Sequence, residues 1–361
     1  MKIKQLQQYL KKNKINLALF ITRFNIKDYN FFYFTKLHES KLNLGILIIP
    51  KSKQPFILVP GFEYVRIKEF IKKHKIKLKI IEMKKTFLED IQKITGKPKI
   101  IGINQDTTTI NGLKKLKRQF KKVKFTDINP ICQELREQKT EDEIKLIKKA
   151  CNITDKIMQN CIKNFKKFKT EKDVVNFLEK QTKKNKCKFA FPPHVASGSN
   201  GYHPHHLPNK NKIKKGLCII DFGVKYKGYC SDMTRTIWIG HPKGQEMNDY
   251  RHVLDTQFKT IKRLKIGMKL SEIEKIARFE LDERAKLFIH SIGHGIGLEI
   301  HENPRINHLN KNKLKENMIF TIEPGIYLKN KYGIRIEDDI LMTKKGPKFL
   351  TKTDKWIKII K

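Results

Sequence analysis

The chain has 361 residues, a mass of 42.6 kDa and a formal net charge of +42, from 78 Lys and Arg against 36 Asp and Glu. This charge is typical of proteins that bind nucleic acid or membrane surfaces, but the lysines are spread along the whole chain, so we attribute most of it to biased composition. Hydrophobic residues make up 39% of the chain, which excludes a disordered protein, and the length predicts two domains.

The start of the chain and its cysteines favour a cytoplasmic protein without a membrane partner. Residues Met1–Leu10 contain no apolar stretch of the length that a secretion signal needs. The longest apolar runs, such as Ile46–Ile49 and Leu217–Ile220, are far shorter than a membrane span. The six cysteines form no C-x-x-C pair, so we expect reduced thiols.

The N-terminal third alternates between short apolar runs and segments of helical period. This alternation predicts an α/β domain over residues 1–125, followed by a linker over 126–139 and a second domain over 140–361. No phosphate-binding loop or catalytic cluster occurs in the first domain. The predicted strands are Leu17–Thr22, Leu44–Ile49, Phe56–Val59, Leu78–Ile81 and Ile100–Ile103, and the predicted helices include Phe62–His74 and Asn111–Lys122.

The second domain opens on a long amphipathic helix. Thr140 stands three residues before Glu143, which is the pattern of a capping box, and apolar residues then recur at helical spacing up to Cys161. The same kind of pattern predicts further helix starts at Thr170 and Ser271.

The second domain also contains a weak internal repeat, in which an apolar run ends in a carboxylate and a second carboxylate follows. Asp221 ends the run Leu217–Ile220 and Asp232 comes 11 residues later; Glu323 ends a second run and Glu337 comes 14 residues later. A carboxylate that continues a buried strand is unfavourable unless it is paired or binds a cation. Two such hairpins related by a pseudo-twofold axis would place four carboxylates around one cavity, where a metal supplies the opposing charge.

Three histidines in a Gly-rich stretch add imidazoles to this set: His290, His294 and His301. An oxygen-rich donor set with one imidazole suits Mn, Co, Fe or Zn better than a thiolate site would. Carboxylates that bridge two cations about 3.5–4 Å apart form the two-metal sites of hydrolases, aminopeptidases among them. The residues therefore predict a site for two divalent metal ions, with Mn, Co, Fe and Zn as the candidates.

Seven stretches of the second domain carry a family resemblance: Phe191–Gly198, Pro204–His206, Ile220–Gly223, Tyr229–Thr236, His290–Pro304, Ile322–Tyr327 and Gly333–Asp338. With them the second domain resembles the methionine aminopeptidase, prolidase and aminopeptidase P family of metallopeptidases, whose catalytic domain is the α+β pita-bread fold. The resemblance spans roughly residues 135–361 and keeps the family's order and spacing. The N-terminal region resembles the creatinase/prolidase amino-terminal domain.

The resemblance implies a role for each candidate ligand. Asp221 and Asp232 would hold the first metal, Asp232 and Glu337 would bridge both metals, and His294 and Glu323 would complete the second site. A hydroxide between the metals would attack the scissile carbonyl, because metal binding makes water more acidic, with Glu323 as the proton acceptor.

Four further residues receive roles from the same resemblance. His205 and His301 would bind the substrate carbonyl and the developing oxyanion, and His290 and Arg335 would support the geometry of the substrate or of the metal ligands. Two more histidines lie beside His205, so that assignment stays open among neighbours: His203 and His206.

Within the family, the N-terminal domain favours enzymes that cleave Xaa-Pro bonds over methionine aminopeptidases, which usually lack it. We expect an Xaa-Pro dipeptidase (a prolidase) in preference to an Xaa-Pro aminopeptidase, acting on short proline-containing peptides as a homodimer without a nucleic-acid partner. One alternative is a pita-bread domain reused as a basic module that binds nucleic acid or protein. Another is a hydrolase of the same fold with a non-prolyl substrate.

Overall fold

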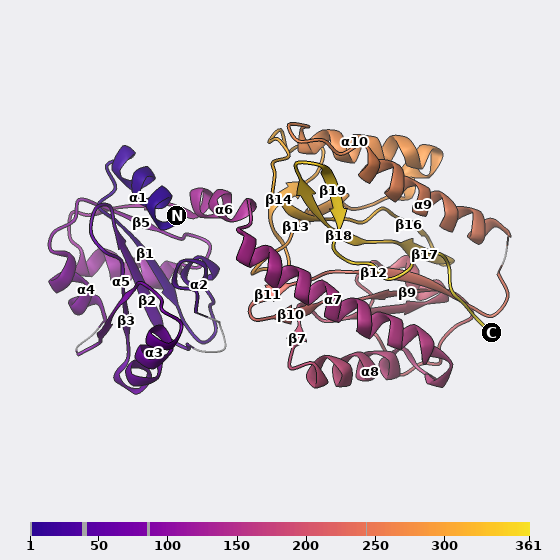
Figure 1. Ribbon diagram of the computed structural model, residues 1–361, viewed down its shortest axis with the longest axis horizontal. Helices are drawn as coiled ribbons and strands as arrows, with labels where there is room; N and C mark the ends of the chain where they lie inside the picture. Colours follow the sequence, from indigo (N-terminus) through magenta and orange to yellow (C-terminus); the bar gives the residue numbers. More distant parts are fainter. Residues whose placement is uncertain (1, 38–41, 85–86, 243) are drawn as a thin grey trace. The chain divides into compact units, whose positions relative to one another are not determined.

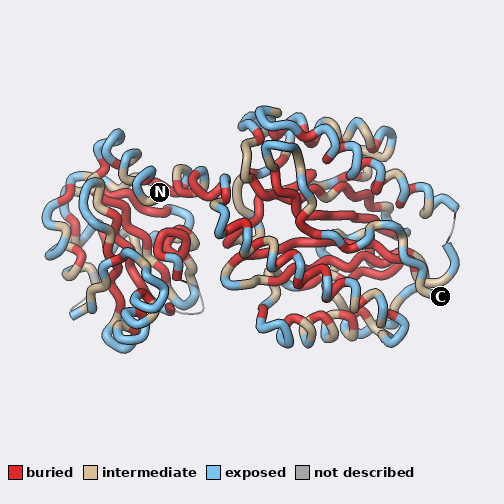
Figure 2. The backbone as a smooth tube through the Cα atoms, viewed as in Figure 1, coloured by how far each residue is buried: buried red, intermediate tan, exposed pale blue. Residues whose placement is uncertain are grey.

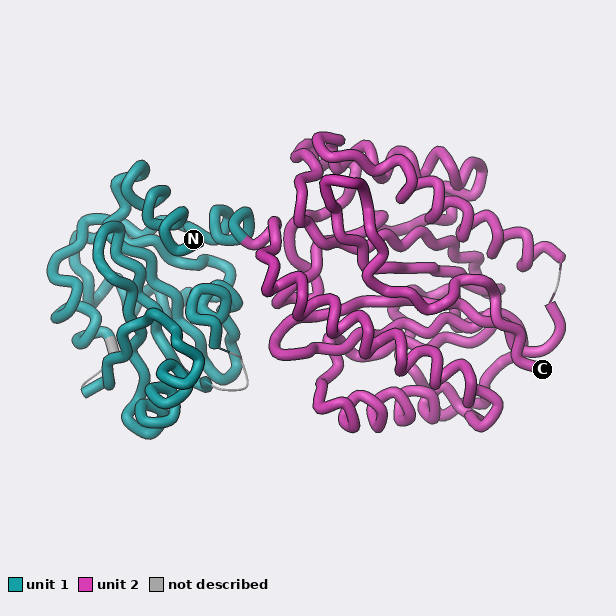
Figure 3. The backbone as a smooth tube through the Cα atoms, viewed as in Figure 1, with its two compact units in different colours: residues 1–135 teal, residues 136–361 magenta. Residues whose placement is uncertain are grey.

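A computed structural model describes residues 2–37, 42–84, 87–242 and 244–361. The chain divides into two compact units, Met1–Leu135 (unit 1) and Arg136–Lys361 (unit 2), each with its own sheets and core (Figure 3). The stretch expected as a linker, 126–139, holds the end of a strand and helix α6 (Asn129–Glu137). In both units the central strands are buried, and exposed residues gather on the helices, loops and edge strands (Figure 2).

Unit 1 is built on a mixed six-stranded sheet with the strand order β4-β3-β2-β1-β5-β6 (Figure 1). Strand β2 pairs antiparallel with β1 and with β3. The pairs β3–β4, β1–β5 and β5–β6 are parallel. The strands are β1 Leu17–Thr22, β2 Gly45–Pro50, β3 Phe56–Val59, β4 Lys79–Glu82, β5 Ile100–Ile103 and β6 Lys124–Asp127. The helices before α6 are α1 Lys2–Lys12, α2 Tyr29–Thr35, α3 Gly61–Lys73, α4 Phe87–Thr95 and α5 Ile110–Gln119.

This arrangement confirms the α/β class predicted for the N-terminal region. The five predicted strands occur within one residue of their predicted bounds. Strand β6 is the one that the apolar pattern does not predict, because it lies at the edge of the sheet and its four residues Lys124–Asp127 are only half-buried or exposed.

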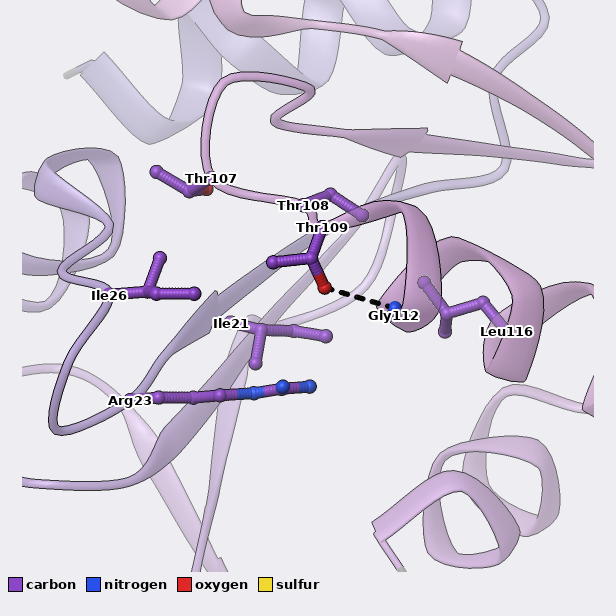
Figure 4. Close-up of a pocket in the computed structure, with 8 residues that line it drawn as sticks. All are labelled: Ile21, Arg23, Ile26, Thr107, Thr108, Thr109, Gly112 and Leu116. Atoms are coloured by element: carbon purple, nitrogen blue, oxygen red, sulfur yellow. Dashed lines mark hydrogen bonds between the residues drawn. The ribbon is translucent and has the colours of Figure 1, made fainter.

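Unit 1 contains a small pocket of about 20 Å³ between β1 and the start of α5, lined in part by Arg23 and Thr107 (Figure 4). The Thr109 hydroxyl accepts the Gly112 N–H at 3.0 Å and so caps helix α5. A space of this size holds about one water molecule, so the pocket is too small for a peptide substrate.

Unit 2 has helices on both sides of its strands. Helices α7 and α8 lie along one side and α9 and α10 along the other (Figure 1). Its sheets have the orders β11-β10-β7, β20-β12-β9-β8, β14-β13-β15-β18-β19 and β16-β17. The helices are α7 Glu141–Lys163, α8 Glu171–Lys184, α9 Gly244–Lys262 and α10 Leu270–Leu281, with 3-10 turns η2 Phe165–Lys167, η3 Gly198–Tyr202 and η4 Asp282–Leu287. The first strands are β7 Lys188–Phe189, β8 His194–Ser197, β9 Gly216–Asp221, β10 Val224–Tyr226, β11 Tyr229–Cys230 and β12 Thr234–Ile239. The later strands are β13 Gly293–Gly295, β14 Glu302–Ile306, β15 Ile319–Ile322, β16 Gly325–Leu328, β17 Tyr332–Arg335, β18 Asp338–Thr343, β19 Gly346–Phe349 and β20 Ile359–Ile360.

The internal repeat of the sequence corresponds to two strand–hairpin–strand units. In the first, β9 leads into the short hairpin β10–β11 and the chain returns as β12, which pairs antiparallel with β9. In the second, β15 leads into the hairpin β16–β17 and the chain returns as β18, which pairs antiparallel with β15. The two strand–hairpin–strand repeats within unit 2 therefore share the same order of elements and the same pairing.

Local capping interactions explain where two of the helices begin. Both predicted boxes form: the Thr140 and Thr170 side chains accept the N–H groups of Glu143 and Asp173, whose carboxylates bond back. The third prediction, with Ser271 as the cap residue of a helix, is wrong: the cap lies two residues earlier. Helix α10 has Lys269 as its N-cap, because Glu272, not Glu274, accepts the N–H group of the cap residue, at 3.1 Å.

None of the described helices is both long enough and apolar enough to span a membrane.

Candidate metal centre

Four candidate ligands occupy equivalent points of the two strand–hairpin–strand units. Asp221 is the last residue of β9 and Glu323 follows the last residue of β15. Asp232 and Glu337 come shortly before the returning strands β12 and β18. Because β9 pairs with β12 and β15 with β18, the two carboxylates of each strand–hairpin–strand repeat lie at the same end of their strand pair.

The imidazole of His294 joins this set from strand β13. Its Nε2 atom lies 3.7 Å from Asp232 Oδ2 and 3.6 Å from Glu323 Oε1. Strand β13 approaches β15 so closely that the residue before His294 must be a glycine. A Cβ atom on Gly293 would lie 2.0 Å from the Thr321 carbonyl oxygen. One ligand atom each from Asp232, His294 and Glu337 lie within 4.8 Å of one another.

Burial and mutual repulsion make these carboxylates unfavourable as anions. Burial, together with the charges of Glu337 and Asp221, raises the pKa of Asp232 well above its ordinary value. Burial and the charges of Glu323 and Asp221 do the same to the pKa of Glu337. Burial also raises the pKa of Glu323 to about 7 and lowers the pKa of His294 to about 3, so the imidazole is neutral.

The donor set fits a divalent cation. Asp221 Oδ1 and Asp232 Oδ1 are buried and accept no hydrogen bond from any described residue, although buried carboxylate oxygens are normally satisfied. The Nδ1 atom of His294 lies 3.2 Å from the Gly295 carbonyl oxygen. A proton on Nδ1 leaves the Nε2 lone pair directed at the carboxylates, as in a metal-binding histidine.

Two hydrogen bonds hold ligand carboxylates in place, and a third holds the backbone of Asp232. The Thr234 hydroxyl donates to Glu337 Oε2 at 2.6 Å, and the Arg335 guanidinium donates to Asp221 Oδ2 at 2.6 Å. Asp339, which sequence reasoning missed, accepts the backbone N–H of Asp232 at 2.9 Å. Each bond removes freedom from a ligand and so preorganises the site.

Tyr327 links two of the predicted support residues. Arg335 Nη1 donates to the Tyr327 hydroxyl at 2.8 Å, and that hydroxyl lies 2.8 Å from His290 Nε2. His290 Nδ1 lies 3.9 Å from Glu323 Oε2. Burial and the charge of Arg335 lower the pKa of His290 to about 4. Tyr327 closes one of the stretches that carry the family resemblance, which is the signal that points to it.

Two more predicted histidines lie beside these groups. The His301 ring packs edge-on against His294, with 4.2 Å between ring centroids. Burial lowers the pKa of His301, and the neighbouring His205 acts in the same direction. The His205 ring stacks on His194, which sequence reasoning did not single out although it lies within Phe191–Gly198.

The structure distinguishes His205 from its two histidine neighbours. His206 Nε2 lies 2.8 Å from the buried carboxylate of Glu171. His203 is exposed and its ring packs edge-on against Tyr202. His205 is therefore the one of the three whose ring contacts another histidine near the ligands.

Comparison with known proteins agrees with this geometry. The model of metallopeptidase family M24 matches residues 145–344, and that of the Creatinase/Prolidase N-terminal domain matches residues 2–138. The chain belongs to metallopeptidase family M24. The predicted pita-bread architecture with a creatinase/prolidase-like N-terminal domain is thereby confirmed, as is a metallopeptidase of the hydrolase class, and the family implies divalent metal ions.

Relatives of this family match the chain over nearly its whole length. An Xaa-Pro dipeptidase of Pyrococcus furiosus is 35% identical, with 98% of each chain covered. A solved Xaa-Pro dipeptidase from Bacillus anthracis is 30% identical with a TM-score of 0.90 and 99% of each chain covered. A solved X-Pro aminopeptidase from Thermotoga maritima is 29% identical with a TM-score of 0.87, covering 97% of this chain and 99% of that one.

Proposed function

We propose that the chain is an Xaa-Pro dipeptidase, which hydrolyses the peptide bond before proline in free dipeptides. The observation that carries the proposal is the cluster of Asp232, His294 and Glu337 in a family M24 chain that is 35% identical to an Xaa-Pro dipeptidase. The reuse of the fold as a binding module is not favoured, since the relatives that match over the full length are peptidases.

Five residues would hold two divalent metal ions: Asp221, Asp232, His294, Glu323 and Glu337. Mn or Co is our preferred metal, with Zn or Fe as alternatives, because the donor set combines four carboxylates with one imidazole. When bound, such cations polarise the scissile carbonyl and make a water molecule more acidic.

Side chains of the protein would carry out proton transfer, bind the substrate carbonyl and align the ligands. Glu323 would also accept a proton from the attacking water and deliver it to the proline nitrogen. His205 and His301 would donate hydrogen bonds to the carbonyl oxygen as it gains negative charge. The hydrogen bonds that link His290, Tyr327 and Arg335 to Asp221 would keep Asp221 and the substrate aligned.

A substrate panel tests the proposal. Metal-free protein is reconstituted with Mn²⁺ or Co²⁺ and assayed on Leu-Pro, Met-Pro, Leu-Ala and Leu-Pro-Gly, with Asp232→Asn as the matched inactive control. Hydrolysis of Leu-Pro and Met-Pro alone supports the dipeptidase. Cleavage of Leu-Pro-Gly before proline indicates an aminopeptidase, equal cleavage of Leu-Ala indicates a non-prolyl peptidase, and inactivity with every metal refutes a peptidase.

We also propose a cytoplasmic homodimer with no nucleic-acid partner. Light scattering of the purified chain should then give about 85 kDa, twice the 42.6 kDa of one chain. Binding to RNA at physiological salt, with affinity falling steeply as salt rises, would contradict the last part of this proposal.

A further inference from the structure

The segment between η3 and β9 carries His205, the histidine proposed to bind the substrate carbonyl. His205 is exposed, and its imidazole makes no hydrogen bond within the part of the chain that the structure describes. An exposed ring without such a bond samples several rotamers, and a group that acts on the transition state must be held in one. Another contact must therefore restrict this ring.

His194 supplies that contact. Its ring lies parallel to that of His205, with 5.4 Å between centroids and 13° between planes. Its Nδ1 atom lies 3.2 Å from the carbonyl oxygen of His206, so a proton on Nδ1 is donated to the backbone next to His205. His194 thus touches both the ring that must be oriented and the chain that carries it.

The other end of this arrangement is anchored on the metal centre. His194 begins strand β8, and its register partner on β9 is Asp221, a proposed metal ligand. The position of the His194 backbone is therefore fixed relative to that ligand, and the stacked ring transfers this position to His205.

A buried carboxylate fixes the rest of the segment. Glu171, 1% exposed, accepts hydrogen bonds from the Ser197 N–H at 2.9 Å and the Asn200 amide at 2.8 Å, and it lies 2.8 Å from His206 Nε2. The loop is thus held at His206 by Glu171 through the side chain and by His194 through the carbonyl. Only the ring of His205 remains to be set by the stack.

We propose that His194 is a positioning residue, which holds the His205 imidazole in the orientation that meets the substrate carbonyl. This inference rests on the proposed Xaa-Pro dipeptidase activity. If His205 acts mainly in the transition state, loss of His194 lowers kcat and leaves KM nearly unchanged. Loss of the stack together with the hydrogen bond should lower kcat about 10–50-fold.

Three substitutions separate the two contacts. His194→Ala removes both, His194→Phe keeps a flat ring without a donor, and His194→Asn keeps an amide donor near Nδ1 without a ring. Positioning predicts that Phe and Asn each recover part of the kcat lost in the alanine variant. His203→Ala, in the same segment but packed on Tyr202, is the control and should leave kcat and KM unchanged.

The deciding experiment is a double-mutant cycle on the Mn²⁺-loaded protein with Leu-Pro. His194→Ala should lower kcat strongly when His205 is present and by less than about twofold in the His205→Ala background, because the effect acts through His205. Equal losses in both backgrounds overturn the proposal, since His194 would then act through Asp221 or through folding. Metal content is measured for every variant, and a loss of bound Mn²⁺ in His194→Phe likewise overturns it.

A second readout does not depend on peptidase activity. The ring C–H resonance of His205, assigned with His205→Ala, should shift in the proton NMR spectra of His194→Ala and His194→Phe and stay in place in His203→Ala. An inactive wild-type protein that shows these shifts refutes the proposed function but not the contact. A resonance that stays in place in both His194 variants refutes the positioning role whatever the activity.

Discussion

Removal of the Asp232 charge should stabilise the metal-free protein while abolishing its response to metal. Asp232 is 4% exposed, its Oδ1 accepts no hydrogen bond from a described residue, and burial with the charges of Glu337 and Asp221 raises its pKa. Asp232→Asn keeps the size of the side chain and removes its charge. Without a cation the substitution relieves an unfavourable interaction; with a cation it removes a favourable one.

The size of the effect follows from the distance between the carboxylates. Ligand atoms of Asp232 and Glu337 lie within 4.8 Å of each other, where two unit charges repel by about 3.5 kcal/mol at an effective dielectric constant of 20. Because the pKa values of these groups are raised in the folded state, the wild-type protein loses stability as pH rises through them. The gain from Asp232→Asn should therefore approach about 3 kcal/mol at pH 8 and shrink on acidification.

Calorimetry in chelator and in excess Mn²⁺ measures both halves of the prediction. In chelator at pH 8 the Tm of Asp232→Asn should exceed that of the wild type by about 6–12 °C, the shift that about 3 kcal/mol produces in a domain of this size. Excess Mn²⁺ should raise the Tm of the wild type and leave that of the variant unchanged. Asp142→Asn, on the exposed start of α7, is the control and should move neither value.

A variant that is less stable than the wild type in chelator would refute the electrostatic reasoning. An equal rise in Tm with Mn²⁺ in both proteins would refute the assignment of Asp232 as a ligand.

Three further predictions concern groups around the centre and in unit 1. Arg335→Met leaves the buried Asp221 without its guanidinium partner, so urea unfolding of the metal-free protein should show a loss of about 3–5 kcal/mol, and an unchanged stability would contradict this. Cys151 donates to Asp339 at 3.3 Å, so Cys151→Val should cost about 1–3 kcal/mol in the same assay and Cys151→Ser much less; equal losses would refute the bond. Burial raises the pKa of Asp28 to about 6, so the wild type should lose about 2 kcal/mol from this group between pH 4.5 and 7.5, and Asp28→Asn should not; parallel pH profiles in urea unfolding would argue against it.

The strand framework of the site was predictable from the sequence because each strand–hairpin–strand repeat has a local sequence pattern. The apolar run before Asp221 and the run before Glu323 become β9 and β15, and the capping boxes at Thr140 and Thr170 form as predicted. Short-range chemistry sets these features, so one sequence is enough to find them.

The side-chain contacts around the ligands were not predictable in the same way. The stack of His194 on His205 and the support of Asp232 by Asp339 join residues whose separation in the sequence is bridged only by folding. The edge strand β6 carries too few buried apolar residues to give a strand pattern in the sequence. The start of α10 depends on which glutamate accepts the N–H group of the cap residue.

Turnover of Leu-Pro as metal is added back to chelated protein tests the central claim most directly. Proline release should be absent in chelator, rise with Mn²⁺ or Co²⁺ and reach its plateau at two ions per chain, while Asp232→Asn stays inactive at every concentration. Full turnover in chelator, or no turnover with Mn²⁺, Co²⁺, Zn²⁺ or Fe²⁺, would contradict a two-metal Xaa-Pro dipeptidase.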